Sequence, residues 1–194
     1  ALARLAEDWW ETQMTESPTW ATYLGDFRYN DRLEEQGPEA RLRRAGQLRA
    51  FDARLRALDR AALAAEGDRI LADLLARKIA LELEEPTHKF YQWRLAQMDG
   101  PQARFFQLVN FHPFKTAQEI ADFATRLEAF PRSMAEYLGD LRAGVAEGRV
   151  ATKVVARRVL DQLDALLAVP PATCVLHTAI DKLPADLPER AALA

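Results

Sequence analysis

Apolar residues recur at spacings of three and four positions along almost the whole chain, which is typical of helices that bury one face. The apolar–polar alternation that marks a half-buried strand is nearly absent. We therefore predict an all-α fold, an irregular array of about seven to nine helices. The helices are expected at residues 2–15, 18–24, 38–65, 68–85, 102–110, 116–129, 131–147, 153–168 and 172–183.

Glycine and proline divide this pattern into elements. Gly67 separates the expected helices 38–65 and 68–85, and Pro86 should end the second of them. Two long helices joined by so short a turn predict an antiparallel helical hairpin. Pro131 should start a new helix, because proline suits the first helical position.

Two glycines lie inside the expected helix 131–147. Gly139 and Gly144 each cost about 1 kcal/mol relative to alanine in a helix interior. A close approach of another element would explain both, so we expect tight packing against this helix.

Length and composition favour one soluble domain. The chain has 194 residues, of which 49% are hydrophobic and 28% charged, with a formal net charge of −3. We predict a single helical domain over residues 1–194. No apolar run approaches the roughly 20 residues that span a bilayer, so we expect no membrane partner and a cytoplasmic location. The single cysteine, Cys174, excludes an internal disulfide and lies in an apolar run, where a buried core thiol is expected.

No catalytic or metal-binding motif is complete. The three histidines, His88, His112 and His177, are far apart in sequence, whereas a helical zinc site needs two of them about four residues apart. Phosphate-binding glycine loops, cysteine pairs and calcium loops are also missing. We therefore predict no catalytic residue, no metal ligand and no cofactor in this segment.

The expected helix 38–65 carries many arginines: Arg41, Arg43, Arg44, Arg49, Arg54, Arg56 and Arg60. They could form a patch for nucleic acid or another anionic surface. Alternatively they form a solvated face that Glu39, Asp52 and Asp59 neutralise. Because the whole chain is acidic, we favour the solvated face and expect no nucleic-acid partner.

The most distinctive segment runs from Asn110 through Phe111-His112-Pro113-Phe114 to Lys115. The residue before a proline is pushed to extended geometry, so a rigid corner between two helices is expected. Thr116 and Glu119 then form a capping box for the next helix. The corner could line a substrate cleft through Asn110, His112 and Lys115. Alternatively it is a structural turn whose phenylalanines fill the core and whose histidine is capped or exposed, and we favour this alternative.

Several short motifs follow one another in a fixed order. They are Ser17-Pro18-Thr19-Trp20-Ala21, Leu24-Gly25, Asn30-Asp31-Arg32-Leu33, Gly100-Pro101-Gln102, His112-Pro113 with Thr116, Arg126-Leu127, Pro131, Leu141-Arg142-Ala143-Gly144 with Gly148, and Val159-Leu160-Asp161-Gln162-Leu163. Together they resemble the amino-terminal part of a bacterial family known as domain of unknown function 885. The resemblance covers nearly the whole chain.

The resemblance implies a role that depends on sequence outside this chain. Members of the family are much longer, mostly helical and similar to zincin-type metallopeptidases. Their carboxy-terminal half carries a helix of the HExxPGHxxQ kind, in which two histidines would bind zinc and a glutamate would activate water. Nothing in the present sequence matches those positions, so no catalytic residue is carried over.

By this resemblance the chain is the amino-terminal lobe, a wall or lid of the substrate cleft. It is expected to be inactive alone, with any zinc in the carboxy-terminal part. The implied partners are that remainder of the same protein and a peptide substrate, and a homodimer stays open. The alternative is a stand-alone helical binding or scaffold module.

Overall fold

The computed structural model describes residues 1–185, apart from the side chains of Ile180 and Asp181. Within this range every regular element is a helix, which confirms the all-α fold and the expected number of helices. The α-helices are α1 (Leu2–Glu16), α2 (Pro18–Tyr23), α3 (Pro38–Arg56), α4 (Glu66–His88), α5 (Pro101–Gln107), α6 (Ala117–Ala146), α7 (Lys153–Leu167) and α8 (Thr178–Asp181). Short 3-10 helices are η1 (Phe27–Tyr29), η2 (Arg60–Ala62), η3 (Phe90–Gln92), η4 (Leu108–Asn110), η5 (Pro171–Thr173) and η6 (Val175–His177). One domain over residues 1–194 stays a prediction, because residues 186–194 lie outside this range.

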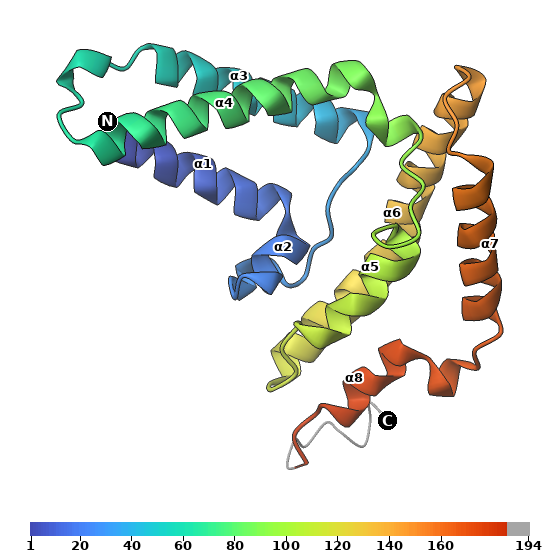
Figure 1. Ribbon diagram of the computed structural model, residues 1–194. Helices are drawn as coiled ribbons and strands as arrows, with labels where there is room; N and C mark the ends of the chain where they lie inside the picture. The colour runs from blue at the N-terminus through green and yellow to red at the C-terminus, as the bar shows by residue number, and fades with distance from the viewer. Residues whose placement is uncertain (186–194) are drawn as a thin grey trace.

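The helices form two groups, each with its own apolar core (Figure 1). Helices α1, α3 and α4 enclose the first core, which consists of Leu2, Leu5, Leu48, Phe51, Leu55, Ala72, Leu75 and Ile79. The second core lies around α5, η4, α6 and α8 and consists of Phe105, Leu108, Val109, Phe114, Phe123, Ala179 and Leu183. Helix α2 and the segment after it run between the two groups (Figure 1).

Helices α3 and α4 form the predicted antiparallel hairpin, and Figure 1 shows them side by side. However, α3 ends at Arg56, well before the predicted end at Ala65. The side chain of Asp59 accepts a hydrogen bond from the Ala61 backbone N–H, which stabilises η2 in place of further α-helix. Leu58 and Leu63 in this connection pack against the first core, so the chain turns back without exposing them fully.

Two predicted helix boundaries at proline are wrong. Pro86 lies inside α4, which continues to His88, and Pro131 lies inside α6, which runs without interruption. A proline inside a helix removes one backbone hydrogen bond. In α6 buried residues lie on both sides of Pro131, including Arg126 and Tyr137, so tertiary packing holds the two halves in one helix.

The predicted helix 172–183 is broken into η5, η6 and the short α8. Cys174 between the two 3-10 helices has extended dihedral angles, with φ −62° and ψ 144°. The Thr173 hydroxyl donates to the Pro170 carbonyl at 3.1 Å, a local bond that competes with helix formation. Cys174 is a half-buried free thiol, so the expectation of a fully buried core thiol is wrong.

Gly144 shows the close approach that its position in a helix predicts. A Cβ atom built on Gly144 would lie 2.0 Å from the Gln92 carbonyl oxygen and 2.9 Å from the Arg149 carbonyl oxygen. Gly139 has nothing within 4 Å of such a Cβ, so the same prediction is wrong there. Gly144 thus allows α6 and η3 to come into backbone contact.

The two glycines form a matched pair for a stability test. We expect Gly144→Ala to lower the free energy of unfolding by about 1–3 kcal/mol, because the backbone of η3 must move to admit the methyl group. Gly139→Ala should raise it by about 0.5–1 kcal/mol, the usual gain from replacing a helical glycine. Urea denaturation of the two variants checks this, and equal effects would contradict the assigned backbone contact.

Candidate functional site

The corner at Asn110–Lys115 is a structural element built around a buried histidine. His112 is only 4% exposed, and its ring packs against Phe114 and Phe123 at centroid distances of 4.9 and 5.1 Å. Asn110 and Lys115 are exposed. The three candidate residues therefore do not converge on one site, and their contact with a substrate stays a prediction.

His112 reaches Arg126, a guanidinium that is 0% exposed on α6. All of its hydrogen-bond acceptors are neutral. They are the carbonyl oxygens of Pro18 (3.1 Å), Tyr29 (3.1 Å) and Arg32 (2.8 Å), the Thr22 hydroxyl (2.7 Å) and Nδ1 of His112 (3.1 Å). Burial lowers the pKa of Arg126 to about 10. The group remains protonated at neutral pH and joins α6 to α2 and to the segment after it.

These contacts also fix the tautomer of His112. Because Nδ1 accepts from Arg126, the ring proton resides on Nε2, which donates to the Glu119 carbonyl oxygen at 2.7 Å. Burial lowers the pKa of His112, the Glu119 hydrogen bond opposes that shift, and the charge of Arg126 adds to it. The predicted capping box is confirmed, since Thr116 and Glu119 bond reciprocally at the start of α6.

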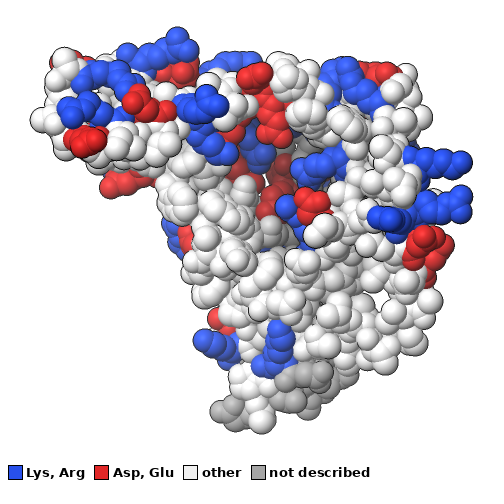
Figure 2. Space-filling view, in the orientation of Figure 1, with Lys and Arg blue, Asp and Glu red and all other residues white. Residues whose placement is uncertain are grey.

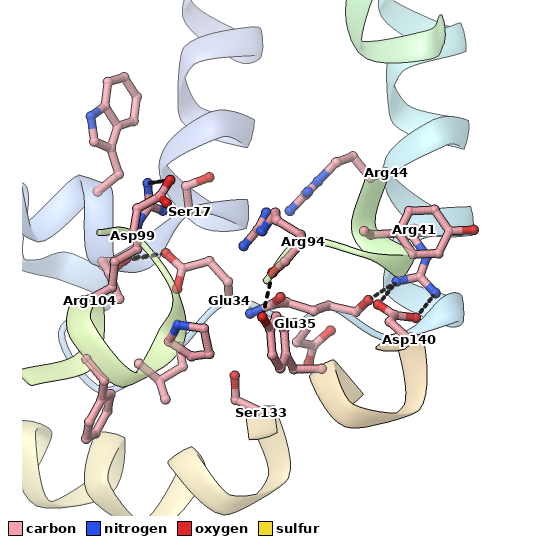
Figure 3. Close-up of a pocket in the computed structure, with 18 of the residues that line it drawn as sticks. Ser17, Glu34, Glu35, Arg41, Arg44, Arg94, Asp99, Arg104, Ser133 and Asp140 are labelled. Carbon is pink, nitrogen blue, oxygen red and sulfur yellow. Dashed lines mark hydrogen bonds and ion pairs between the residues drawn. The ribbon is translucent and has the colours of Figure 1, made fainter. Parts of the chain in front are cut away.

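A pocket of about 660 Å³ lies between the two groups of helices (Figure 3). Its lining comes from both groups: α1, α2, α3 and α4 on one side, and α5 and α6 on the other. Figure 2 shows a hollow there with both basic and acidic side chains around it. Phe111 belongs to the lining, but Asn110, His112 and Lys115 do not. The pocket is the best candidate for a functional site.

The pocket combines opposite charges with aromatic surface. Its five cationic side chains are Arg41, Arg44, Lys78, Arg94 and Arg104. Its six carboxylates are Glu34, Glu35, Glu82, Glu85, Asp99 and Asp140. The aromatic lining residues are Trp20, Tyr23, Phe90, Tyr91, Phe105, Phe111, Phe130 and Tyr137. Such a lining suits a ligand that carries both charges and an apolar side chain.

Several of the lining charges are held by neighbours. Arg41 forms a bidentate ion pair with Asp140, at 2.7 and 2.8 Å, and stacks over the Tyr91 ring at 4.0 Å. Glu34 accepts hydrogen bonds from the backbone N–H and hydroxyl of Thr19, at 3.0 and 2.5 Å. These hydrogen bonds and ion pairs hold Arg41, Asp140 and Glu34 in fixed positions on the pocket wall.

One further carboxylate fixes the loop that enters the pocket. Glu136 of α6 accepts from the backbone N–H groups of Gln36 and Gly37 at 2.9 and 3.0 Å. The contact ties the start of α3 to the second group of helices. Together with the Arg41–Asp140 pair it sets the width of the pocket.

Sequence reasoning missed the pocket residues because their partners are far apart in the chain. Arg41 and Asp140 are 99 positions apart, and Gln36 is 100 positions from its partner Glu136. Periodicity reports only the neighbours within one helix. One available signal was the motif Ser17-Pro18-Thr19-Trp20, three residues of which line the pocket.

The arginine-rich face is heavily ion-paired. Arg43 and Arg44 share Glu16, Arg54 pairs with Asp8, Arg56 with Asp52, and Arg60 with Asp73. Of the three carboxylates that were expected to neutralise this face, Asp52 does so. The other carboxylates in these pairs lie in α1 (Asp8 and Glu16) and α4 (Asp73). The ion pairs are consistent with a solvated face, while the absence of a nucleic-acid partner stays a prediction.

The described residues contain neither a metal-binding cluster nor a membrane-spanning helix. Across residues 1–185 no group of three or more His, Cys, Asp or Glu side chains could hold a metal ion. In the same residues no helix is long and apolar enough to cross a membrane.

The lowered pKa of His112 predicts a pH dependence of stability. Since the unfolded histidine titrates near pH 6.5 and the folded one lower, its contribution should be complete above about pH 6.5 and lost as the pH falls below that value. We expect the free energy of unfolding to decrease from pH 7.5 to 5.5. The decrease should vanish in His112→Gln and persist in His177→Gln, whose parent side chain is exposed. Urea titrations at several pH values measure this, and equal slopes in all three proteins would contradict it.

Comparison with known proteins agrees with the resemblance in the sequence. No curated protein matches the chain. The family model described as "Bacterial protein of unknown function (DUF885)" matches residues 18–194, which include every described helix except α1 and most of the pocket lining. The chain belongs to this bacterial family of unknown function.

Proposed function

We propose that the chain is a substrate-binding lobe, a wall of the cleft in a peptidase-like hydrolase, and that its pocket binds peptide. The observation that carries the proposal is the pocket between the two groups of helices. It offers aromatic surface for side chains and charges of both signs for the ends of a peptide. A volume of about 660 Å³ lies within the usual range for small-ligand sites.

An exposed face of α7 favours a lobe over a stand-alone module. Leu160, Leu163 and Leu167 share one side of this helix and are 60%, 39% and 84% exposed. A stripe of leucines at this spacing is typical of a helix that packs against another element. The remainder of the same protein is the partner that the family resemblance implies. A cytoplasmic location stays a prediction.

If the full-length protein uses zinc, we propose that the zinc site lies outside residues 1–185 of this chain. In residues 1–185 no three His, Cys, Asp or Glu side chains could hold a metal ion together. His88 lies beside Glu84, and His112 is bonded to Arg126 and Glu119. The proposed lobe contributes binding surface, and any zinc ligands must come from other sequence.

Blocking the pocket tests the proposal. Ser133 of α6 lines the pocket, whereas Ala135 on the same helix is exposed outside the lining. We expect the unmodified chain to bind short peptides with a dissociation constant below about 1 mM, a free energy of about −4 kcal/mol. Ser133→Trp should abolish this binding, since the indole fills the cavity, and Ala135→Trp should retain it. Saturation-transfer NMR with a tripeptide mixture measures peptide binding by both variants. Binding that survives Ser133→Trp would contradict the proposal that peptide binds in the pocket.

Metal analysis is a second test. We expect the chain, purified and then exposed to zinc, to retain far less than one equivalent after gel filtration. Inductively coupled plasma mass spectrometry gives the ratio. Stoichiometric zinc would contradict the assignment of metal ligands to other sequence.

A further inference from the structure

Arg94 is the least neutralised cation of the pocket. It is exposed, and none of the ion pairs or side-chain hydrogen bonds among residues 1–185 involves its guanidinium. Its backbone is nevertheless held in place. The buried Tyr137 hydroxyl donates to the Arg94 carbonyl oxygen at 2.5 Å. The side chain therefore starts from a fixed point on the pocket wall.

Arg44 of α3 also lines the pocket, and its charge is only partly compensated. It donates to the carbonyl oxygen of Glu16 at 3.1 Å and to its carboxylate at 3.3 Å. Arg43 shares the same carboxylate, also at 3.3 Å. Charge-assisted bonds usually measure about 2.7–2.9 Å, so Glu16 holds Arg44 at a longer distance than usual. Arg43 has a second partner in Glu35 at 3.0 Å, whereas Glu16 is the one carboxylate paired with Arg44 among residues 1–185.

The two guanidinium groups of Arg44 and Arg94 point into the middle of the pocket in Figure 3. Like charges directed at one space repel each other, and an anion placed between them removes that cost. Arg41 is already neutralised, because Asp140 accepts from both terminal nitrogens of its guanidinium and the Gln36 carbonyl oxygen accepts from one of them.

We propose that Arg44 and Arg94 together bind the free α-carboxylate of a peptide, an inference that rests on the peptide-binding function proposed above. Six carboxylates line the same pocket against five cations, which disfavours a polyanion such as a phosphorylated ligand. A zwitterionic peptide matches both kinds of lining charge. Its carboxylate lies at the two arginines, and the acidic side chains of the wall attract its ammonium group. Trp20 and Phe111 offer aromatic surface for the terminal side chain.

The test compares Ala-Ala-Phe with the same tripeptide amidated at its carboxyl end. Binding is followed by NMR, including the Nε–Hε signals of the arginines, for the unmodified chain and for Arg44→Gln, Arg94→Gln and Arg142→Gln. Arg142 is the matched control, because it is exposed, lies outside the pocket lining and forms no ion pair among residues 1–185. Urea denaturation verifies that each variant is folded.

We expect amidation to weaken binding about tenfold or more, because two charge-assisted contacts are lost. Arg44→Gln and Arg94→Gln should weaken binding of the free acid to a similar extent and leave the amide nearly unaffected, while Arg142→Gln changes neither. Equal binding of acid and amide would overturn the carboxylate site and leave the peptide pocket standing. Absence of binding by either tripeptide would overturn both proposals. Displacement of the free acid by an equal concentration of inorganic phosphate would show a general anion site and overturn the preference for a peptide carboxylate.

Discussion

The buried guanidinium of Arg126 is the contact on which the arrangement of the two groups of helices depends. It carries a positive charge into a site with no exposure, where an unsatisfied charge would cost several kcal/mol. Three backbone carbonyls, one hydroxyl and one imidazole nitrogen accept from it. The acceptors come from both sides of the pocket, so the free energy of satisfying one side chain orients α2 and the following segment against α6.

The pocket follows from that orientation. Each group of helices buries its own apolar core, so the space between them is bounded mostly by polar and aromatic side chains outside the cores, with Leu48, Phe105 and Leu108 at the core edges. The Arg41–Asp140 pair and the Glu136 contacts fix the far edge. Many of the hydrogen bonds that hold the pocket walls involve backbone groups rather than flexible side chains. The walls are therefore preorganised. A preorganised site loses less conformational entropy when a ligand binds.

His112 shows that residue type alone does not determine the role of a side chain. An imidazole beside aromatics and a lysine resembles a ligand-binding corner in sequence. In the fold its two nitrogens are used by Arg126 and Glu119, and its ring is buried. The helices themselves were predictable because their periodicity is local, and the capping box at Thr116 was found for the same reason. The ends at Pro86 and Pro131 were not predictable, because tertiary packing offsets the local penalty of proline.

The sequence by itself determined the helical class, the α3–α4 hairpin and membership of the family, since each depends on neighbouring residues or on motif order. Tertiary structure alone decided which charges meet. Arg44 and Arg94 are 50 positions apart, and local periodicity does not relate them. They meet because the tertiary fold brings α3 and the segment after η3 to the same pocket. A pocket lined by side chains from six helices is defined only after those helices have packed, because its geometry is a property of their contacts.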